Sequence, residues 1–69
     1  MTFGEAIIKL RSERRISQRQ LAEELNVSFT SVNRWENGKT MPNKMTVFVI
    51  RKYCEEHGQD FSYDEGVRA

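Results

Sequence analysis

Signals for the start of a helix recur along this chain, and turn residues follow each of them after a short interval. Thr2 and Glu5 form a capping-box pattern, and Ser17 and Gln20 repeat it. Ser28 is another residue that caps helix N-termini well. Because this spacing leaves room only for short helices, it predicts an all-α domain built from several of them.

Apolar residues follow each signal at helical spacing. In chain order they are Phe3, Ala6, Ile7 and Leu10, then Leu21, Ala22 and Leu25, and then Val32 and Trp35. The pattern predicts helices over about 3–14, 18–25 and 29–37. Asn26 should end the second helix, since Asn tolerates the left-handed conformation of a sharp turn. Asn37 and Gly38 should end the third.

A fourth helix is predicted over about 44–57, with Asn43 as its cap and Gly58 at its end. Residues 47–50 are β-branched or aromatic and favour a strand locally, but the chain offers no second strand to pair with it. On a helical wheel, one broad apolar face contains Val47, Val49, Ile50, Tyr53 and Cys54, and Met45 and Phe48 fall outside it.

The last stretch is a tail over 59–69, in which residues near 60–65 could form a short helix or a turn. Phe61 and Tyr63 could pack back onto the core. The last few residues are expected to fray.

The length and charge of the chain limit its function. A chain of 69 residues has room for one domain, 1–69, which buries only about 60% of its unfolded surface, so a catalytic cleft is not expected. The net charge is +1, but residues 1–52 carry +5 and residues 53–69 carry −4. This division predicts a basic face followed by an acidic end, unless it is only a solvated surface.

Several classes of protein do not fit. A single cysteine and the absence of a charged, then apolar leader indicate a reducing, cytoplasmic setting. The longest apolar run, 47–50, is far shorter than the roughly 20 residues of a membrane span. Cys54 and His57 are too few ligands for zinc, and no nucleophile or phosphate-binding glycine loop accompanies the acids of the tail. We therefore expect no metal, no cofactor and no enzymatic activity.

Residues 17–37 have the features of a helix-turn-helix unit, with a small residue at the crossing, a turn and an outward second helix. Residues 3–58 resemble the Cro/repressor (Xre-type, Cro/CI-type) helix-turn-helix family. The matching segments are Ser17-Gln18, Gln20-Leu21-Ala22, Val27-Ser28, Trp35-Glu36-Asn37-Gly38-Lys39 and Pro42. The resemblance implies a compact lambda-repressor-like domain of four to five helices. It also implies sequence-specific binding of double-stranded DNA by the third helix, and regulation of transcription, with repression expected.

In the family, the positions that face the DNA major groove correspond here to Ser28, Phe29, Thr30, Asn33 and Arg34. Arg34 suits bidentate contact with guanine, unless it is an ordinary surface arginine. Asn33 could read adenine or point along the backbone. Phe29 departs from the family, which often has a polar residue there. It could lie against a thymine methyl group or form a hydrophobic lid on the start of the helix.

The resemblance also places residues on the DNA backbone and within the domain. Gln18 begins a helix whose free amides favour a phosphate, and Asn37, Lys39 and Lys44 also match phosphate contacts. Arg11 and Glu36 match an ion pair that links the first helix to the third. Ala22, Val32 and Trp35 are expected to be structural, with Trp35 in the core.

Two kinds of partner are predicted besides DNA. A homodimer on a pseudo-palindromic site is expected, with Phe48, Met45, Phe61 and Tyr63 as candidate contacts, although packing of the tail on its own chain is the alternative. The second hypothesis for the function is a protein-interaction module, such as an antitoxin or co-regulator whose acidic end binds a protein.

Overall fold

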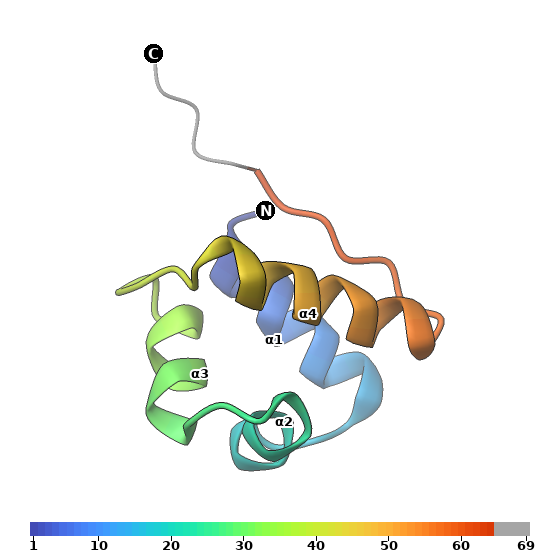
Figure 1. The fold of residues 1–69 in the computed structure, drawn as a ribbon, viewed down its shortest axis with the longest axis horizontal. Coiled ribbons are helices and arrows are strands. Elements are labelled where there is room, and N and C mark those ends of the chain that lie inside the picture. Colours follow the sequence, from blue (N-terminus) through green and yellow to red (C-terminus); the bar gives the residue numbers. More distant parts are fainter. Residues whose placement is uncertain (65–69) are drawn as a thin grey trace.

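The computed structural model describes residues 1–64, which fold into four helices. They are α1 (Phe3–Arg14), α2 (Gln18–Leu25), α3 (Phe29–Glu36) and α4 (Lys44–Glu56). Figure 1 shows α4 crossing in front of α1, with α3 at one side of the pair and α2 below it. No strand forms within the part of the chain that the structure describes. The prediction of an all-α domain is confirmed.

Each helix begins at the cap that the sequence predicted. The Thr2 hydroxyl accepts a hydrogen bond from the Glu5 amide at 3.1 Å, and the Glu5 carboxylate accepts one from the Thr2 amide at 2.9 Å. The side chains of Ser17, Ser28 and Asn43 accept equivalent bonds from the first turns of α2, α3 and α4. These bonds pair amides that would otherwise have no partner inside a helix.

The helix ends depend on unusual backbone angles. Asn26 adopts the left-handed conformation, with φ of 61°, as predicted. Arg15 adopts it too, with φ of 58°, which its residue type does not suggest. The third and fourth helices end one residue earlier than expected, at Glu36 and Glu56, because Asn37 and His57 serve as their C-caps.

The core lies where the four helices meet. Ile7, Leu21, Val32 and Ile50, one from each helix, have no exposed surface. Burying a side chain of this size stabilises a fold by roughly 1.5 to 3 kcal/mol. Two other core residues, Ala22 and Trp35, are 2% and 5% exposed, and the Trp35 ring packs edge-on against Phe3 with 6.0 Å between centroids.

The predicted apolar face of α4 is wrong at one residue. Val49 is 42% exposed, whereas Ile50, Tyr53 and Cys54 are buried and Val47 is partly buried. The buried residues recur at spacings of three and four, which defines a narrow stripe, and Val49 lies beside it. Met45 and Phe48 are exposed, as the wheel predicted.

The expected short helix near 60–65 does not form over residues 60–64, and Glu65 lies outside the described residues. Phe61 and Tyr63 both contact the Phe3 ring edge-on, at centroid distances of 5.9 and 5.0 Å. In a helix, residues two apart point to very different sides, so both rings could not reach Phe3. Figure 1 shows this segment running back to the N-terminus, where the Asp64 amide donates to the Met1 carbonyl at 2.8 Å.

Gly4 lies where α1 approaches the end of α3. A Cβ atom at this position would lie 2.4 Å from the Trp35 carbonyl oxygen and 2.9 Å from that of Glu36. Both atoms belong to the backbone, so they can move away only if α3 shifts. Only glycine allows this approach.

Gly4→Ala should therefore lower the free energy of unfolding by about 1 to 3 kcal/mol, the usual cost of overpacking. Chemical denaturation measures this change. Ser12→Ala, at an exposed position of the same helix, is the control and should change stability by no more than about 0.5 kcal/mol. Equal effects of the two substitutions would disprove the close approach.

A polar link joins α1, α2 and α4. The Tyr53 hydroxyl donates to the Glu24 carboxylate, and Arg14 donates to both of these groups. Burial, followed by the nearby carboxylate, raises the pKa of Tyr53 to about 12. The hydrogen bond from Tyr53, with a contribution from Arg14, lowers the pKa of Glu24.

Because the pKa of Glu24 is lower in the folded protein than in the unfolded chain, its stabilisation is complete above about pH 4.5. The stabilisation is lost as the pH falls through the folded value. Glu24→Gln and Tyr53→Phe should each make the loss of stability below about pH 4.5 less steep. Urea titrations between neutral and acid pH measure the slope, and an unchanged slope in both variants would contradict the link.

Candidate nucleic-acid interface

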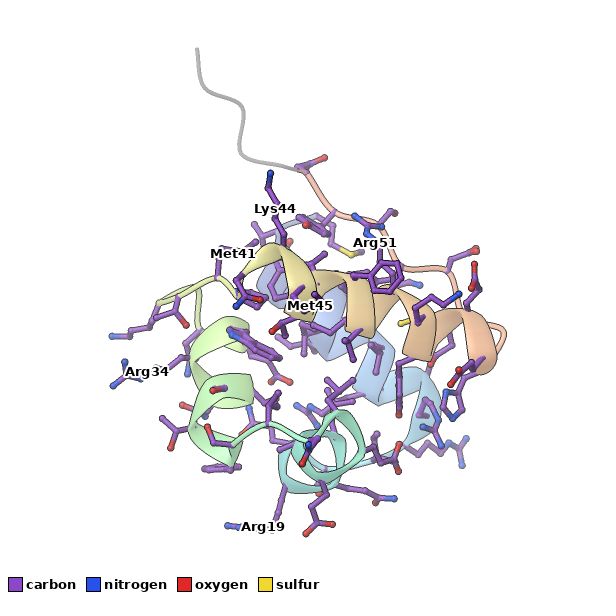
Figure 2. The ribbon with its side chains drawn as sticks, in the orientation of Figure 1. Arg19, Arg34, Met41, Lys44, Met45 and Arg51 are labelled. Atoms are coloured by element: carbon purple, nitrogen blue, oxygen red, sulfur yellow. The ribbon has the colours of Figure 1, made fainter. Side chains whose placement is uncertain are left out.

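The outward face of α3 contains polar and basic side chains. Its inward side buries Val32 and Trp35, which leaves Thr30 and Arg34 exposed on the other side and Phe29 40% exposed at the start. In Figure 2, Arg34 extends away from the body of the protein. A short helix with one buried side and one polar, exposed side is suited to insertion into a groove.

Ser28 begins this helix. Its hydroxyl oxygen accepts a bond from the Ser31 amide at 3.0 Å and lies 2.9 Å from the Ser31 hydroxyl. The residue is exposed at the tip of α3, although its hydroxyl is already used for capping.

Glu36 holds three helices together. Its side chain is only 6% exposed, and its carboxylate accepts bonds from Arg11 Nε at 2.6 Å and Arg11 Nη2 at 2.9 Å. Gln18 Nε2 donates to the same carboxylate at 2.8 Å. The bond to Glu36 raises the pKa of Arg11. The expected pair of Arg11 and Glu36 is thus present, and it also engages the first residue of α2.

The hydrogen bonds continue from this carboxylate toward the surface. Gln18 Oε1 accepts from Asn33 Nδ2 at 3.2 Å, and Asn37 Nδ2 donates to the carbonyl and side-chain oxygens of Asn33 at 3.0 and 3.2 Å. We call Arg11, Glu36, Gln18, Asn33 and Asn37 the Glu36 network. Three of the residues expected to touch DNA therefore belong to one chain of amides, and both ends of the Asn33 amide have protein partners.

Basic side chains lie on both sides of α3. Lys39 and Lys44 are exposed after the end of α3, and Arg19 is exposed on α2. Figure 2 shows Arg19 and Lys44 extending from opposite edges of the molecule, with Arg34 between them. Arg19 was not among the residues predicted from the sequence to contact DNA, although it directly follows Gln18 in the first turn of α2.

The part of the chain that the structure describes, residues 1–64, offers neither a metal site nor a membrane-spanning helix. No group of three or more His, Cys, Asp or Glu side chains there could hold a metal ion. No helix in this part of the chain is long and apolar enough to cross a membrane.

Comparison with known proteins agrees with this geometry. A helix-turn-helix family matches residues 7–61, which include all four helices from the middle of α1 onward. The chain belongs to the Cro/repressor helix-turn-helix family. Within the matched residues, α2 and α3 are joined by a turn of three residues, 26–28.

Two relatives are similar to this chain in sequence. One is the HTH-type transcriptional activator BcrR of Enterococcus faecalis, 42% identical over 53 residues, which are 77% of this chain and 26% of the relative. The other is the HTH-type transcriptional regulator DicA of Escherichia coli K12, 36% identical over 55 residues, which are 80% of this chain and 41% of the relative. The chain thus spans less than half the length of either relative. No solved structure gives a significant match.

Breaking the Glu36 network should strongly destabilise the folded protein. Arg11→Ala should lower the free energy of unfolding by about 3 kcal/mol, because it leaves the buried Glu36 carboxylate without its main partner. Thermal or chemical denaturation checks this value.

The matched control on the same helix is Lys9→Ala. Lys9 pairs with Glu13 at 2.9 Å, but both side chains are 44% exposed, so its loss should cost only about 0.3 to 0.5 kcal/mol. Similar costs for Arg11→Ala and Lys9→Ala would show that the Glu36 pair does not hold the helices together.

Proposed function

We propose that this chain binds double-stranded DNA at specific sequences, with α3 in the major groove, and thereby regulates transcription without enzymatic activity. The observation that carries the proposal is the polar, exposed face of α3, which the Glu36 network joins to α1 and α2. Family membership supports it. We do not assign repression or activation to this chain, since one relative is named an activator and the other a regulator. We also propose that the protein acts in the cytoplasm.

Base reading is assigned to the exposed side of α3. Arg34 is long and unhindered, and its guanidinium can donate two parallel bonds to guanine O6 and N7. Thr30, on the same face, can donate, accept or present its methyl group. Ser28 and Phe29 lie at the tip that enters the groove first. Asn33 has one amide hydrogen beyond its bond to Gln18, and we propose that this hydrogen reaches a base acceptor.

Phosphate binding is assigned to both ends of the unit. Gln18 begins α2, where the positive end of the helix dipole and free backbone amides favour an anion. Asn37, Lys39 and Lys44 lie at and after the other end of the unit. With about 4 to 6 phosphates neutralised per subunit, affinity should fall steeply as the salt concentration rises.

A two-fold dimer is the proposed binding form, because a single small domain of this kind binds weakly and paired half-sites about 34 Å apart add affinity. Met45 and Phe48, which are 70% and 58% exposed on α4, are the proposed contacts. Phe61 and Tyr63 pack against Phe3 of their own chain, so they are less available for this role.

A second candidate function has one observation in its favour. The exposed apolar side chains of α4 lie in the same domain as the exposed acids Glu55, Glu56 and Asp60. An antitoxin or co-regulator could bind a protein through such a surface. Both roles are compatible within one chain.

Selection of bound sequences from a pool of random duplexes at low salt tests the main proposal. Enrichment of a two-fold symmetric sequence is expected, and the distance between its halves reports the dimer. If no duplex is retained while a stable complex with a protein is isolated from the cell, DNA binding is not the main role.

Two substitutions separate base reading from phosphate binding. Arg34→Ala should reduce the preference for the selected sequence by about 1 to 3 kcal/mol and affect non-specific binding less. Lys44→Ala should weaken binding to every sequence and reduce the salt dependence by about one unit. Fluorescence anisotropy on specific and scrambled duplexes at several salt concentrations measures both. Identical profiles for the two variants would contradict the assignments.

A further inference from the structure

Two exposed side chains from different helices meet beside the proposed DNA-binding face. Arg19 lies in the first turn of α2, and Phe29 is the first residue of α3. The Arg19 guanidinium carbon lies 5.0 Å from the centre of the Phe29 ring, which is the geometry of a cation–π contact. The stacked pair thus joins the N-terminal end of α2 to the N-terminal end of α3.

Phe29 lies outside the hydrophobic core of the domain. Its side chain is not among the partly buried apolar residues that contact the core, a group that includes Val27 and Ile16. It is 40% exposed instead, and Arg19 covers its ring. A large apolar side chain held in this way at the tip of α3 is suited to contact with another molecule.

Arg19 has unused hydrogen-bonding capacity. Arg11 and Arg14 have carboxylate partners, whereas Arg19 takes part in none of the ion pairs among residues 1–64. Stacking uses the face of a guanidinium and leaves its N–H edge free. That edge suits bidentate contact with a phosphate, and the start of α2 is the end of the helix that favours one.

The chemistry of the pair points to thymine. An aromatic ring cannot hydrogen-bond to a base edge, and the apolar group that the major groove offers is the 5-methyl group of thymine. Phe29 lies at the end of α3 that contacts bases in this type of docking. Arg19 would hold the ring in place and bind the phosphate beside that base.

We infer that Arg19 and Phe29 act together as a reader of thymine, with Phe29 against the 5-methyl group and Arg19 both positioning the ring and binding the adjacent phosphate. This inference rests on the proposed function. It adds Arg19 to the residues proposed to contact DNA, and it favours the thymine contact of Phe29 over the role of a lid on the start of α3.

The test replaces each thymine of the selected duplex by uracil in turn, which removes only the methyl group. For the wild-type protein, we expect one position per half-site at which uracil weakens binding about fourfold, the effect of burying one methyl-sized group. Phe29→Ala should abolish this difference at that position only. Fluorescence anisotropy at constant salt measures each affinity.

Arg19→Lys distinguishes positioning from simple charge. Lysine keeps the charge but lacks the planar group that stacks on the ring. The variant should therefore keep the salt dependence of the wild type and lose most of the difference between thymine and uracil. Lys44→Ala is the control, which should weaken binding and leave that difference unchanged. Circular dichroism checks that these surface variants are folded.

Three results would overturn the inference while leaving the proposed function intact. They are equal wild-type binding of thymine and uracil at every position, a thymine preference that Phe29→Ala retains, and a full preference in Arg19→Lys. A wild-type protein that retains no duplex at all would instead remove the proposed function, and the inference with it.

Discussion

The buried carboxylate of Glu36 is the group on which the arrangement of the first three helices depends. Removing a charge from water is costly, and only well-formed charge-assisted bonds offset that cost. Glu36 obtains two bonds from Arg11 of α1 and one from Gln18 of α2, and it is itself the last residue of α3. Gly4 allows α1 to approach the same end of α3. The angle between the two helices of the DNA-binding unit is therefore constrained at one point.

The bonds to the Glu36 carboxylate also connect the packed helices with side chains at the surface. Gln18 and Asn33 are bonded to each other, and Gln18 is bonded to Glu36, so side chains beside the exposed face of α3 have hydrogen-bond partners within the protein. Arg34 and Phe29 lie outside this chain of bonds. The structure thus distinguishes the hydrogen-bonded side chains that join α3 to α1 and α2 from the exposed side chains that take no part in those bonds.

Much of the fold was predictable because its signals are local. The caps at Thr2, Ser17, Ser28 and Asn43 each bond to an amide three residues away, and Asn26 turns the chain by its own backbone preference. The predictions were wrong where contacts between residues far apart in the chain determine the structure. The apolar width of α4 depends on how the other helices pack against it, and the segment containing Phe61 extends because its partner, Phe3, lies at the other end of the chain.

The sequence by itself determined the four helices, the residues at which they begin, the family and the set of polar residues around α3. Only the tertiary structure decided which of those residues are already bonded and which remain free. Asn33 and Gln18 are engaged within the protein, whereas Arg19 stacks on Phe29 across the turn. The physical reason is that caps and turns are formed by residues close together in the chain, so the sequence alone can predict them. Whether a side chain still has free hydrogen-bonding groups depends instead on the angles at which separate helices pack.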